Sequence, residues 1–457
     1  MIAIGSSIGT GLFLASGQMI SQSGPGGALL SYTLVGIVIY FLMHGLGEIS
    51  TYRPVSGSVM TFTKDYVDPA LGFSVGWVYY YTAISTIAMD IIACGIFMRF
   101  WFPDIPIWVF NTLFFTIVLI VNLLGSKSFG EAEFWMSSVK IVTIIIFLII
   151  GIIIILGLTG QEQLGFKNFF YDGGPFIGNI NSFFSILILA ALSFGGTELI
   201  GIAAGETENP SKSMPKAINN VILRILIFYI GTIFVIGAII PYTSPYLLNS
   251  NTNLITTPFA LVFQYAQIPA VDSIMNFVIL TALISACNSE FYASTRILYS
   301  LGKEKFAPKR FTLANKKGIP YFSIIVTIFT LIMSFIVAIM GYEACLILIN
   351  GIGISTLLIW LCFGLSHHRF RKGYLKQGLD LTELKFKAKF FPIGSLIVIF
   401  GVSIMLIYNL SYGMLSNPKT TLQLFIPLIL FVILFIYYKI RHKTKLVPLD
   451  RIKFKDS

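Results

Sequence analysis

Apolar runs of roughly 18 to 25 residues follow one another almost end to end along this sequence, and each is long enough to cross a bilayer as a helix. Hydrophobic residues fill 56% of the 457 positions and charged residues only 11%, which is too little charge to cover a water-soluble domain of this size. The runs lack the period-two alternation of barrel strands, and only helices or closed barrels satisfy every backbone polar group in lipid. The sequence therefore predicts an all-α integral membrane protein.

We predict about twelve transmembrane helices in one polytopic domain that covers residues 1–457. Helices 1–5 are expected within 1–157, helices 6–10 within 182–365 and helices 11 and 12 within 391–440, before a tail at 441–457. The predicted spans are 1–20, 27–47, 71–98, 106–124, 135–157, 182–205, 222–243, 271–301, 320–340, 343–365, 391–412 and 422–440. A further apolar stretch from Phe259 to Ala266 is too short to cross, so we expect a re-entrant or interfacial piece there.

The distribution of basic residues predicts the orientation. With an even number of spans and both termini cytoplasmic, only three of the 31 Lys and Arg residues lie outside: Arg99, Lys167 and Lys419. This asymmetry predicts a multi-pass protein of a bacterial-type inner (plasma) membrane. The net charge of +11 is then an orientation signal and a contact with anionic lipid head groups, and no nucleic acid is expected as a partner. No cleavable signal is expected before the first helix, which stays in the membrane.

Catalytic and metal chemistry are not indicated. The cysteines lie inside apolar stretches without paired spacing, as small core residues do: Cys94, Cys287, Cys345 and Cys362. No HExxH, GxSxG or paired catalytic constellation accompanies the four histidines His44, His367, His368 and His442. We therefore expect neither an enzyme nor a cofactor or metal site. No repeated filter sequence appears either, which argues against a channel.

Two predicted spans carry glycine runs that should interrupt a helix. The first span contains GSSIGTG from Gly5 to Gly11, and this run alone fits close helix packing as well as it fits a binding site. The sixth span contains SFGGTELIG from Ser193 to Gly201, with an acidic residue beside two glycines. Interrupted helices at matching positions of two five-helix halves are typical of inverted-repeat transporters with a site at the membrane midplane.

Such a site suits a zwitterion. The N-terminal ends of half-helices offer unpaired N–H groups to a carboxylate, and unwound carbonyls accept hydrogen bonds from an ammonium. The candidate carboxylate-binding residues are Ser7, Gly9, Thr10 and Gly11. The candidate residues for the amino end are Ser193, Phe194, Gly195, Gly196 and Glu198.

Six segments of the sequence are informative together: GSSIGTGLF, SGPGGALLSY, RPVSGS, GTELIGIAAGETENPSKSMPKAI, IIPYTSP and SACNSEFYASTRILYSL. They resemble amino acid permeases of the amino acid–polyamine–organocation superfamily. The resemblance runs nearly end to end and is greatest to lysine-specific permeases, also at FGEAEFW and SHHRFRKGY. It implies a five-plus-five inverted repeat with broken helices 1 and 6, alternating access and proton symport. The family also has a basic segment before its first span, whereas this sequence begins at MIAIG, so we expect later loops to set the orientation.

Three charged residues inside predicted spans are functional candidates. Glu198 either takes part in binding or caps the broken sixth helix. Asp90 in the third span either serves a cationic substrate side chain or pairs with an internal basic group. Lys140 at the start of the fifth span could snorkel to the head groups. The resemblance instead implies that it occupies the position where sodium-coupled relatives of the fold bind sodium, with Ser285 or Ser289 nearby, and that it carries the coupling proton.

The eighth span contains polar residues too densely spaced for a lipid-facing surface: Asn288, Ser289, Glu290, Tyr292 and Arg296. Glu290 departs from lysine permeases, which carry a small residue there, and Ala83 and Leu192 replace aromatic residues. Glu206 and Glu208, by contrast, are expected to be solvated.

The resulting hypothesis is proton-coupled lysine uptake, with the proton as coupling ion. The alternatives are a permease for another basic, aromatic or neutral amino acid, and a sensor that keeps the permease fold but signals through a regulatory protein partner.

Overall fold

The computed structural model is helical throughout the part of the chain that it describes, with no strand there. The described residues are 9, 11–158, 163–207, 209–248, 257–267, 270–316, 318–340, 342–415 and 418–454. Side chains are described for these residues except 14, 246, 248, 337–340, 342–347, 412–415 and 418–423. The predicted all-helical class is confirmed over this part.

Nine segments of the described chain are long and apolar enough to cross a bilayer, which makes this a multi-pass membrane protein. Seven of them are the single helices α2 (Ser16–Tyr52), α4 (Pro69–Met98), α6 (Ser126–Ile155), α14 (Val271–Lys303), α17 (Tyr342–Lys376), α18 (Ile393–Leu415) and α19 (Pro418–His442). The other two combine α7 (Ile180–Phe194) with α8 (Leu199–Ala204), and α9 (Pro210–Asn219) with α10 (Val221–Arg224), η4 (Ile225–Gly231) and α11 (Thr232–Ile239).

Shorter elements complete the described fold. They are η1 (Gly11–Ala15), α3 (Ser58–Tyr66), α5 (Ile107–Leu123), α12 (Pro245–Leu248), α13 (Pro258–Tyr265), α15 (Tyr321–Ile328) and α16 (Thr330–Met340), together with five short 3-10 helices, η2 (Lys167–Phe169), η3 (Tyr171–Gly173), η5 (Lys309–Thr312), η6 (Leu381–Glu383) and η7 (Leu449–Arg451). The predicted short piece from Phe259 to Ala266 corresponds to α13, which has only 8 residues and a buried apolar side. Twelve spans and an inverted repeat remain predictions, and residues 1–8 and 10 of the first predicted span lie outside the described residues.

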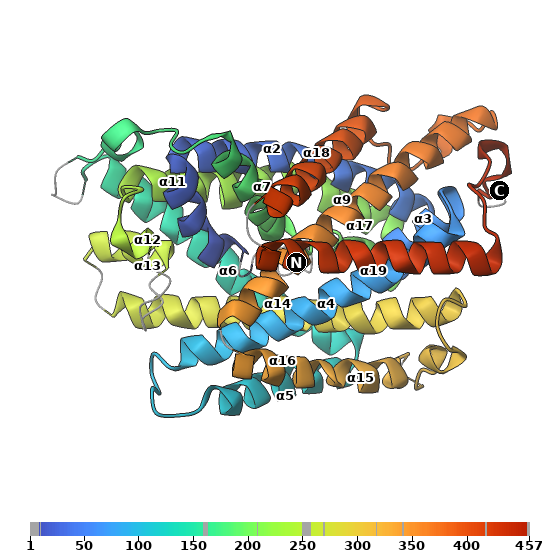
Figure 1. Cartoon of the computed structure of the whole chain (residues 1–457), viewed down its shortest axis with the longest axis horizontal. Helices are drawn as coiled ribbons and strands as arrows, with labels where there is room; N and C mark the ends of the chain where they lie inside the picture. The colour runs from blue at the N-terminus through green and yellow to red at the C-terminus, as the bar shows by residue number, and fades with distance from the viewer. Residues whose placement is uncertain are drawn as a thin grey trace.

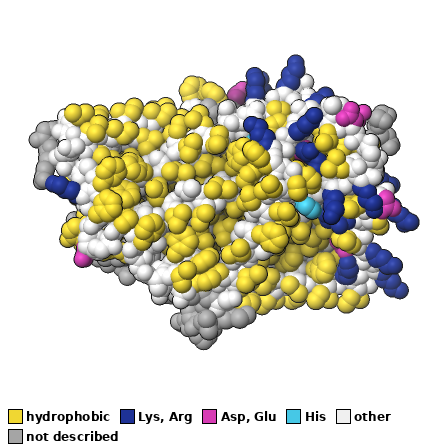
Figure 2. Space-filling model, turned by 90° about the horizontal axis from the view of Figure 1, so that it is seen from above, with side chains coloured by type: hydrophobic (Ala, Val, Ile, Leu, Met, Phe, Trp, Pro, Cys, Tyr) yellow, Lys and Arg dark blue, Asp and Glu magenta, His cyan; other side chains and the backbone are white. Residues whose placement is uncertain are grey.

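The long helices run roughly along the long axis of the molecule, and α4 lies among them in contact with α14, α17 and α19 (Figure 1). The α4 and α14 helices are mainly buried, whereas the apolar surface of α19 is mainly exposed. On the face seen in Figure 2, exposed hydrophobic side chains cover most of the surface, and most of the visible Lys and Arg side chains gather at one end. We call this the basic end; it contains α3 and the C-terminal ends of α14, α17 and α19. An apolar girdle with charge beyond it matches a bilayer.

The helix interruption predicted in the sixth span is present. The α7 helix ends at Phe194, Gly195 is extended, and Gly196 has a φ of 84°, a left-handed conformation that favours glycine. A new helix, α8, starts at Leu199. The first glycine run lies mostly in residues 1–8 and 10, outside the described part of the chain, and helical structure begins at Gly11.

Three predicted boundaries differ from the structure. The α6 helix begins at Ser126 rather than at 135, and α17 continues to Lys376 rather than ending at 365. The end of the first predicted span and the second one form a single element, α2, interrupted only by Gly24, whose φ is 75°. Hydropathy misses these ends because the helices continue into polar sequence, which in α17 is partly buried at Ser366, His367 and Arg371.

A buried ion pair joins α2 to α17 near the basic end. The Nε atom of Arg371 donates to Glu48 at 2.6 Å, and its terminal nitrogen bonds the second carboxylate oxygen. The backbone N–H of Ala388 donates to the same carboxylate at 2.5 Å. Glu48 is fully buried and Arg371 is 5% exposed. The basic segment of α17 is therefore partly internal, although its composition predicts a cytoplasmic surface.

The C-terminal segment after α19 folds back across the basic end. The N–H of Val447 donates to the carbonyl of Val67 at 2.8 Å. The ring of Phe454 lies 5.2 Å from that of Tyr374 and 5.6 Å from that of Phe370. These contacts hold the tail against α17 and the loop after α3.

Candidate functional site

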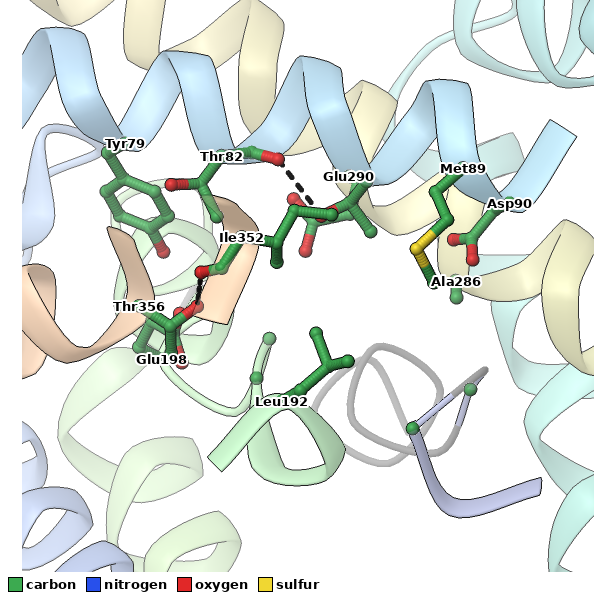
Figure 3. A pocket seen from close by; sticks show the side chains of 15 residues that line it. Tyr79, Thr82, Met89, Asp90, Leu192, Glu198, Ala286, Glu290, Ile352 and Thr356 are labelled. Atoms are coloured by element: carbon green, nitrogen blue, oxygen red, sulfur yellow. Dashed lines mark hydrogen bonds between the residues drawn. The ribbon is translucent and has the colours of Figure 1, made fainter. Parts of the chain in front are cut away.

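An internal cavity lies where α4, α14 and α17 meet the two glycine-rich segments. Its volume, measured as the space open to the centre of a water molecule, is about 40 Å³, enough for a few water molecules. Its polar lining residues are Tyr79, Thr82, Thr86, Asp90, Glu198, Glu290 and Thr356 (Figure 3). None of the described lining residues is basic. A larger ligand can enter only if the surrounding helices separate.

The two glycine-rich segments touch at the wall of this cavity. A Cβ atom on Gly11 would lie only 2.8 Å from the backbone nitrogen of Ser193, so glycine is what lets the start of η1 reach the end of α7. Gly9 lines the cavity beside Ala286 of α14. Gly11 and Ser193 lie 182 positions apart in the sequence, so this contact joins distant segments of the chain.

The break between α7 and α8 contributes Gly195, Gly196 and Glu198 to the cavity. Glu198 is 3% exposed, and one of its carboxylate oxygens accepts a hydrogen bond from the indole N–H of Trp360 at 3.3 Å. The hydroxyl of Thr197 donates to the same oxygen at 3.5 Å. Although Glu198 immediately precedes α8, its side chain makes no capping hydrogen bond to that helix. The backbone at Gly196 and Glu198 also interacts with the carboxylate, which faces the cavity (Figure 3).

One face of α4 forms a second wall. Tyr79, Thr82, Thr86 and Asp90 follow one another at intervals of three or four residues, which places them on the same side of the helix. Asp90 is fully buried, and neither of its carboxylate oxygens has a hydrogen-bond partner among the described residues. A buried carboxylate without a partner is costly, so the site is incomplete without a proton, water or ligand at this position.

The α14 helix places Ala286 and Glu290 on the third wall, one helical turn apart. The carboxylate of Glu290 interacts electrostatically with those of Glu198 and Asp90. The polar residues predicted not to face lipid are all buried, as the spacing indicates: Asn288, Ser289, Glu290, Tyr292 and Arg296.

Lys140 lies beside the cavity rather than in its lining. Its side chain is fully buried on α6, which argues against snorkelling, and it interacts electrostatically with Glu133 and Asp90. Glu133 is also fully buried and accepts hydrogen bonds from Ser285 at 2.5 Å and from Asn288 at 3.3 Å. Asp90 thus connects the cavity to a buried polar network between α6 and α14.

A second polar network lies toward the basic end. The guanidinium of Arg296 donates to Glu206 at 2.9 Å and to Ser126 at 3.3 Å, and the Ser126 hydroxyl donates to Glu206 at 2.7 Å. Arg296 also lies 3.9 Å from the ring centre of Tyr292. Burial acts to raise the pKa of the Glu206 carboxyl, but Arg296 and the hydrogen bonds outweigh it and lower the pKa below its ordinary value. Glu206 is exposed, as expected, and its carboxylate is at the same time paired with Arg296; Glu208 lies outside the described residues.

Most of the predicted site residues that the structure describes lie together. Those that line the cavity are Gly9, Gly11, Asp90, Gly195, Gly196 and Glu198. The side chains of Ser193 and Phe194 point elsewhere: the Ser193 hydroxyl bonds that of Tyr32 at 2.8 Å, and the Phe194 ring lies 4.1 Å from that of Tyr229. Ser7 and Thr10 lie outside the described residues.

Glu133, Thr356 and Trp360 take part in the site or its surroundings but are not among the residues predicted from the sequence. Glu133 lies two helical turns before Lys140 on one face of α6, a spacing that would have identified the pair had the span been extended. Thr356 and Trp360 belong to an apolar stretch of α17, where no local signal separates residues that face the cavity from the rest of the core.

A sequence model of the family described as "Amino acid permease" matches residues 1–450. The chain is 43% identical to the histidine permease HisP of Lactococcus lactis subsp. cremoris (strain MG1363), over 99% of this chain and 95% of that protein. It is also 43% identical to the lysine-specific permease LysP of the same strain, over 99% and 90% of the two chains. The lysine-specific permease LysP of Escherichia coli (strain K12) is 42% identical over 99% of this chain and 94% of its own. The chain belongs to the amino acid permease family.

Proposed function

We propose that this protein is a secondary active transporter that takes up lysine together with protons by alternating access. The observation that carries this proposal is the cavity where the two interrupted segments meet, because it combines backbone suited to a carboxylate with three carboxylate side chains suited to amines. Membership of the amino acid permease family supports amino acid transport rather than catalysis. Lysine is supported by the acidic lining and by the similarity to lysine-specific permeases.

In this mechanism the substrate α-carboxylate lies against the backbone at Gly9 and Gly11, with Ser7 and Thr10 of the same run contributing. The α-ammonium lies at the break between α7 and α8, near Gly195, Gly196 and the Glu198 carboxylate. No cofactor takes part, and the coupling ion is the proton.

The proton site of the proposal is Lys140. Its full burial beside Glu133 and Asp90 favours a group that changes charge during the cycle, because a lysine ammonium in the protein interior is stabilised only by nearby carboxylates. Asp90 faces the cavity as well, so substrate and proton act on one shared residue.

The orientation is part of the proposal. The basic end faces the cytoplasm, with both termini on that side of an inner membrane, and its Lys and Arg contact anionic lipid head groups. The membrane potential then favours entry of a cationic substrate by about 2.3 kcal/mol per charge for each 100 mV.

There are two alternatives to this function. Histidine is the substrate named for one relative at 43% identity, so a histidine permease is the main alternative in the same class. A sensor that keeps the permease fold and signals through a partner is the alternative in another class.

The test is uptake by proteoliposomes under an imposed inward proton gradient. Labelled lysine is the substrate, and arginine, histidine, aromatic and small neutral amino acids are competitors. Saturable lysine uptake that an uncoupler abolishes, and that only close lysine analogues compete for, is the expected result. Preferential histidine uptake would replace lysine as the substrate, whereas binding without flux would support the sensor.

A further inference from the structure

The acidic residues around the cavity outnumber the basic ones. Asp90, Glu198 and Glu290 line it, and all three are buried. Lys140 interacts with Glu133, outside the cavity lining, and with Asp90. Among the described residues no basic side chain interacts with Glu198 or Glu290, so two carboxylates of the lining have no cationic partner there.

A basic amino acid supplies two positive charges on its amine groups, and its α-carboxylate is accommodated separately by the backbone of the glycine-rich segment. Its α-ammonium would neutralise the carboxylate of Glu198, next to the helix break, while Lys140 neutralises that of Asp90. The distal cation of the substrate would then neutralise Glu290. A neutral amino acid brings only the α-ammonium, so it would leave one buried carboxylate unmatched, which penalises its binding.

The position of Glu290 suits this role. It lies on α14, one turn after Ala286, and its carboxylate points into the cavity opposite Thr82 of α4 (Figure 3). It interacts electrostatically with both Glu198 and Asp90, so it lies within reach of a substrate held at either of them. Its side chain is 8% exposed, which means that water screens it poorly.

We propose that Glu290 is the specificity-determining residue that binds the distal cation of a basic amino acid in this cavity. This inference rests on the proposed function, which it deepens by assigning the side-chain selectivity to one residue. Glu290 acts by attraction of the substrate cation and by rejection of substrates that lack one.

The test compares lysine with norleucine, which has the same carbon skeleton without the distal amine. Wild-type protein in proteoliposomes should take up lysine with little competition from norleucine. In E290Q, which keeps the size of the side chain and removes its charge, the KM for lysine should rise at least about tenfold. A tenfold change corresponds to about 1.4 kcal/mol. The preference for lysine over norleucine should fall by a similar factor.

The matched control is D272N. Asp272 is also an acidic residue of α14, but it lies in the first turn of that helix, outside the cavity, where it accepts a hydrogen bond from Gln264. This variant should keep the wild-type KM and selectivity within about twofold. E290D, which keeps the charge on a shorter side chain, should retain the preference for lysine even if its KM rises, and it serves if E290Q does not reach the membrane.

Three results would overturn this inference without contradicting amino acid transport. The first is an E290Q variant that prefers lysine to norleucine as strongly as wild type does. The second is a folded E290D variant that has lost the preference, and the third is wild-type protein that transports amino acids regardless of a distal charge. Wild-type protein that transports no amino acid would instead contradict the proposed function. These outcomes are separable because transport of some amino acid by wild type is measured first.

Discussion

Replacing Glu48 by Gln should destabilise the protein by about 3 kcal/mol. The carboxylate of Glu48 forms two hydrogen bonds with the guanidinium of Arg371 in a site where both side chains are buried. Removing one partner of a buried ion pair costs about 3–5 kcal/mol, because the other charge stays in the interior without compensation. The amide oxygen of Gln still accepts the N–H of Ala388, so the loss should lie at the lower end of that range.

The assay is the free energy of unfolding in mixed micelles titrated with SDS. D450N is the matched control, because Asp450 pairs with Lys376 on the same helix at 3.8 Å but both side chains are more than half exposed. An exposed pair contributes about 0–1 kcal/mol. The double variant E48Q/R371M removes the unpaired cation and should recover most of the stability lost in E48Q.

Two results would refute this reasoning. One is an E48Q protein that unfolds like D450N, which would mean that water reaches the pair. The other is a double variant at least as unstable as the sum of its single variants, because the cost would then not come from an uncompensated charge.

Three further predictions concern the site and its surroundings. K140A should abolish accumulation driven by a proton gradient while exchange of labelled substrate continues; loss of both activities, or of neither, would contradict the coupling role. E206Q should remove the pH-dependent stabilisation by the Glu206–Arg296 pair. Because Arg296 lowers the pKa of Glu206, this stabilisation is complete above the ordinary pKa of 4.5 and is lost as the pH falls through the lowered pKa. The difference in melting temperature between wild type and E206Q should therefore shrink in acid, and a constant difference from pH 7 to 3 would argue against it. G11A should destabilise the protein by about 1–3 kcal/mol in the same unfolding assay, because the new methyl group meets the backbone of Ser193; wild-type stability would mean that the two segments do not touch.

Features with a strong local cause could be predicted from the sequence. Two adjacent glycines beside an acidic residue are rare inside an apolar run, and the structure ends a helix there, between Phe194 and Leu199. Asp90 could be found in the same way, because a charged residue within a span has few structural reasons to be there. The gathering of Lys and Arg at one end follows from their positions relative to the spans.

Features that depend on tertiary packing could not be predicted. Glu133 is polar and precedes the most apolar part of its helix, so hydropathy places it outside the span, yet it is buried and accepts hydrogen bonds from Ser285 and Asn288 of α14. Glu206 shows the same limit, since it is exposed as expected, whereas its ion pair with Arg296 joins positions 90 residues apart and has no local signal. The Ser193 hydroxyl faces Tyr32 because α7 packs against α2, and no local pattern specifies that rotation.

The docked tail has a practical consequence for work on this protein. Phe454 lies among aromatic residues of α17, next to both Phe370 and Tyr374. A purification tag or fluorescent fusion joined directly after residue 457 would therefore compete for space with those rings. A flexible Gly/Ser linker avoids that crowding, because about ten such residues span roughly 16–19 Å on average. Detergent screens that use a C-terminal reporter should include this linker before a low melting temperature is attributed to the protein.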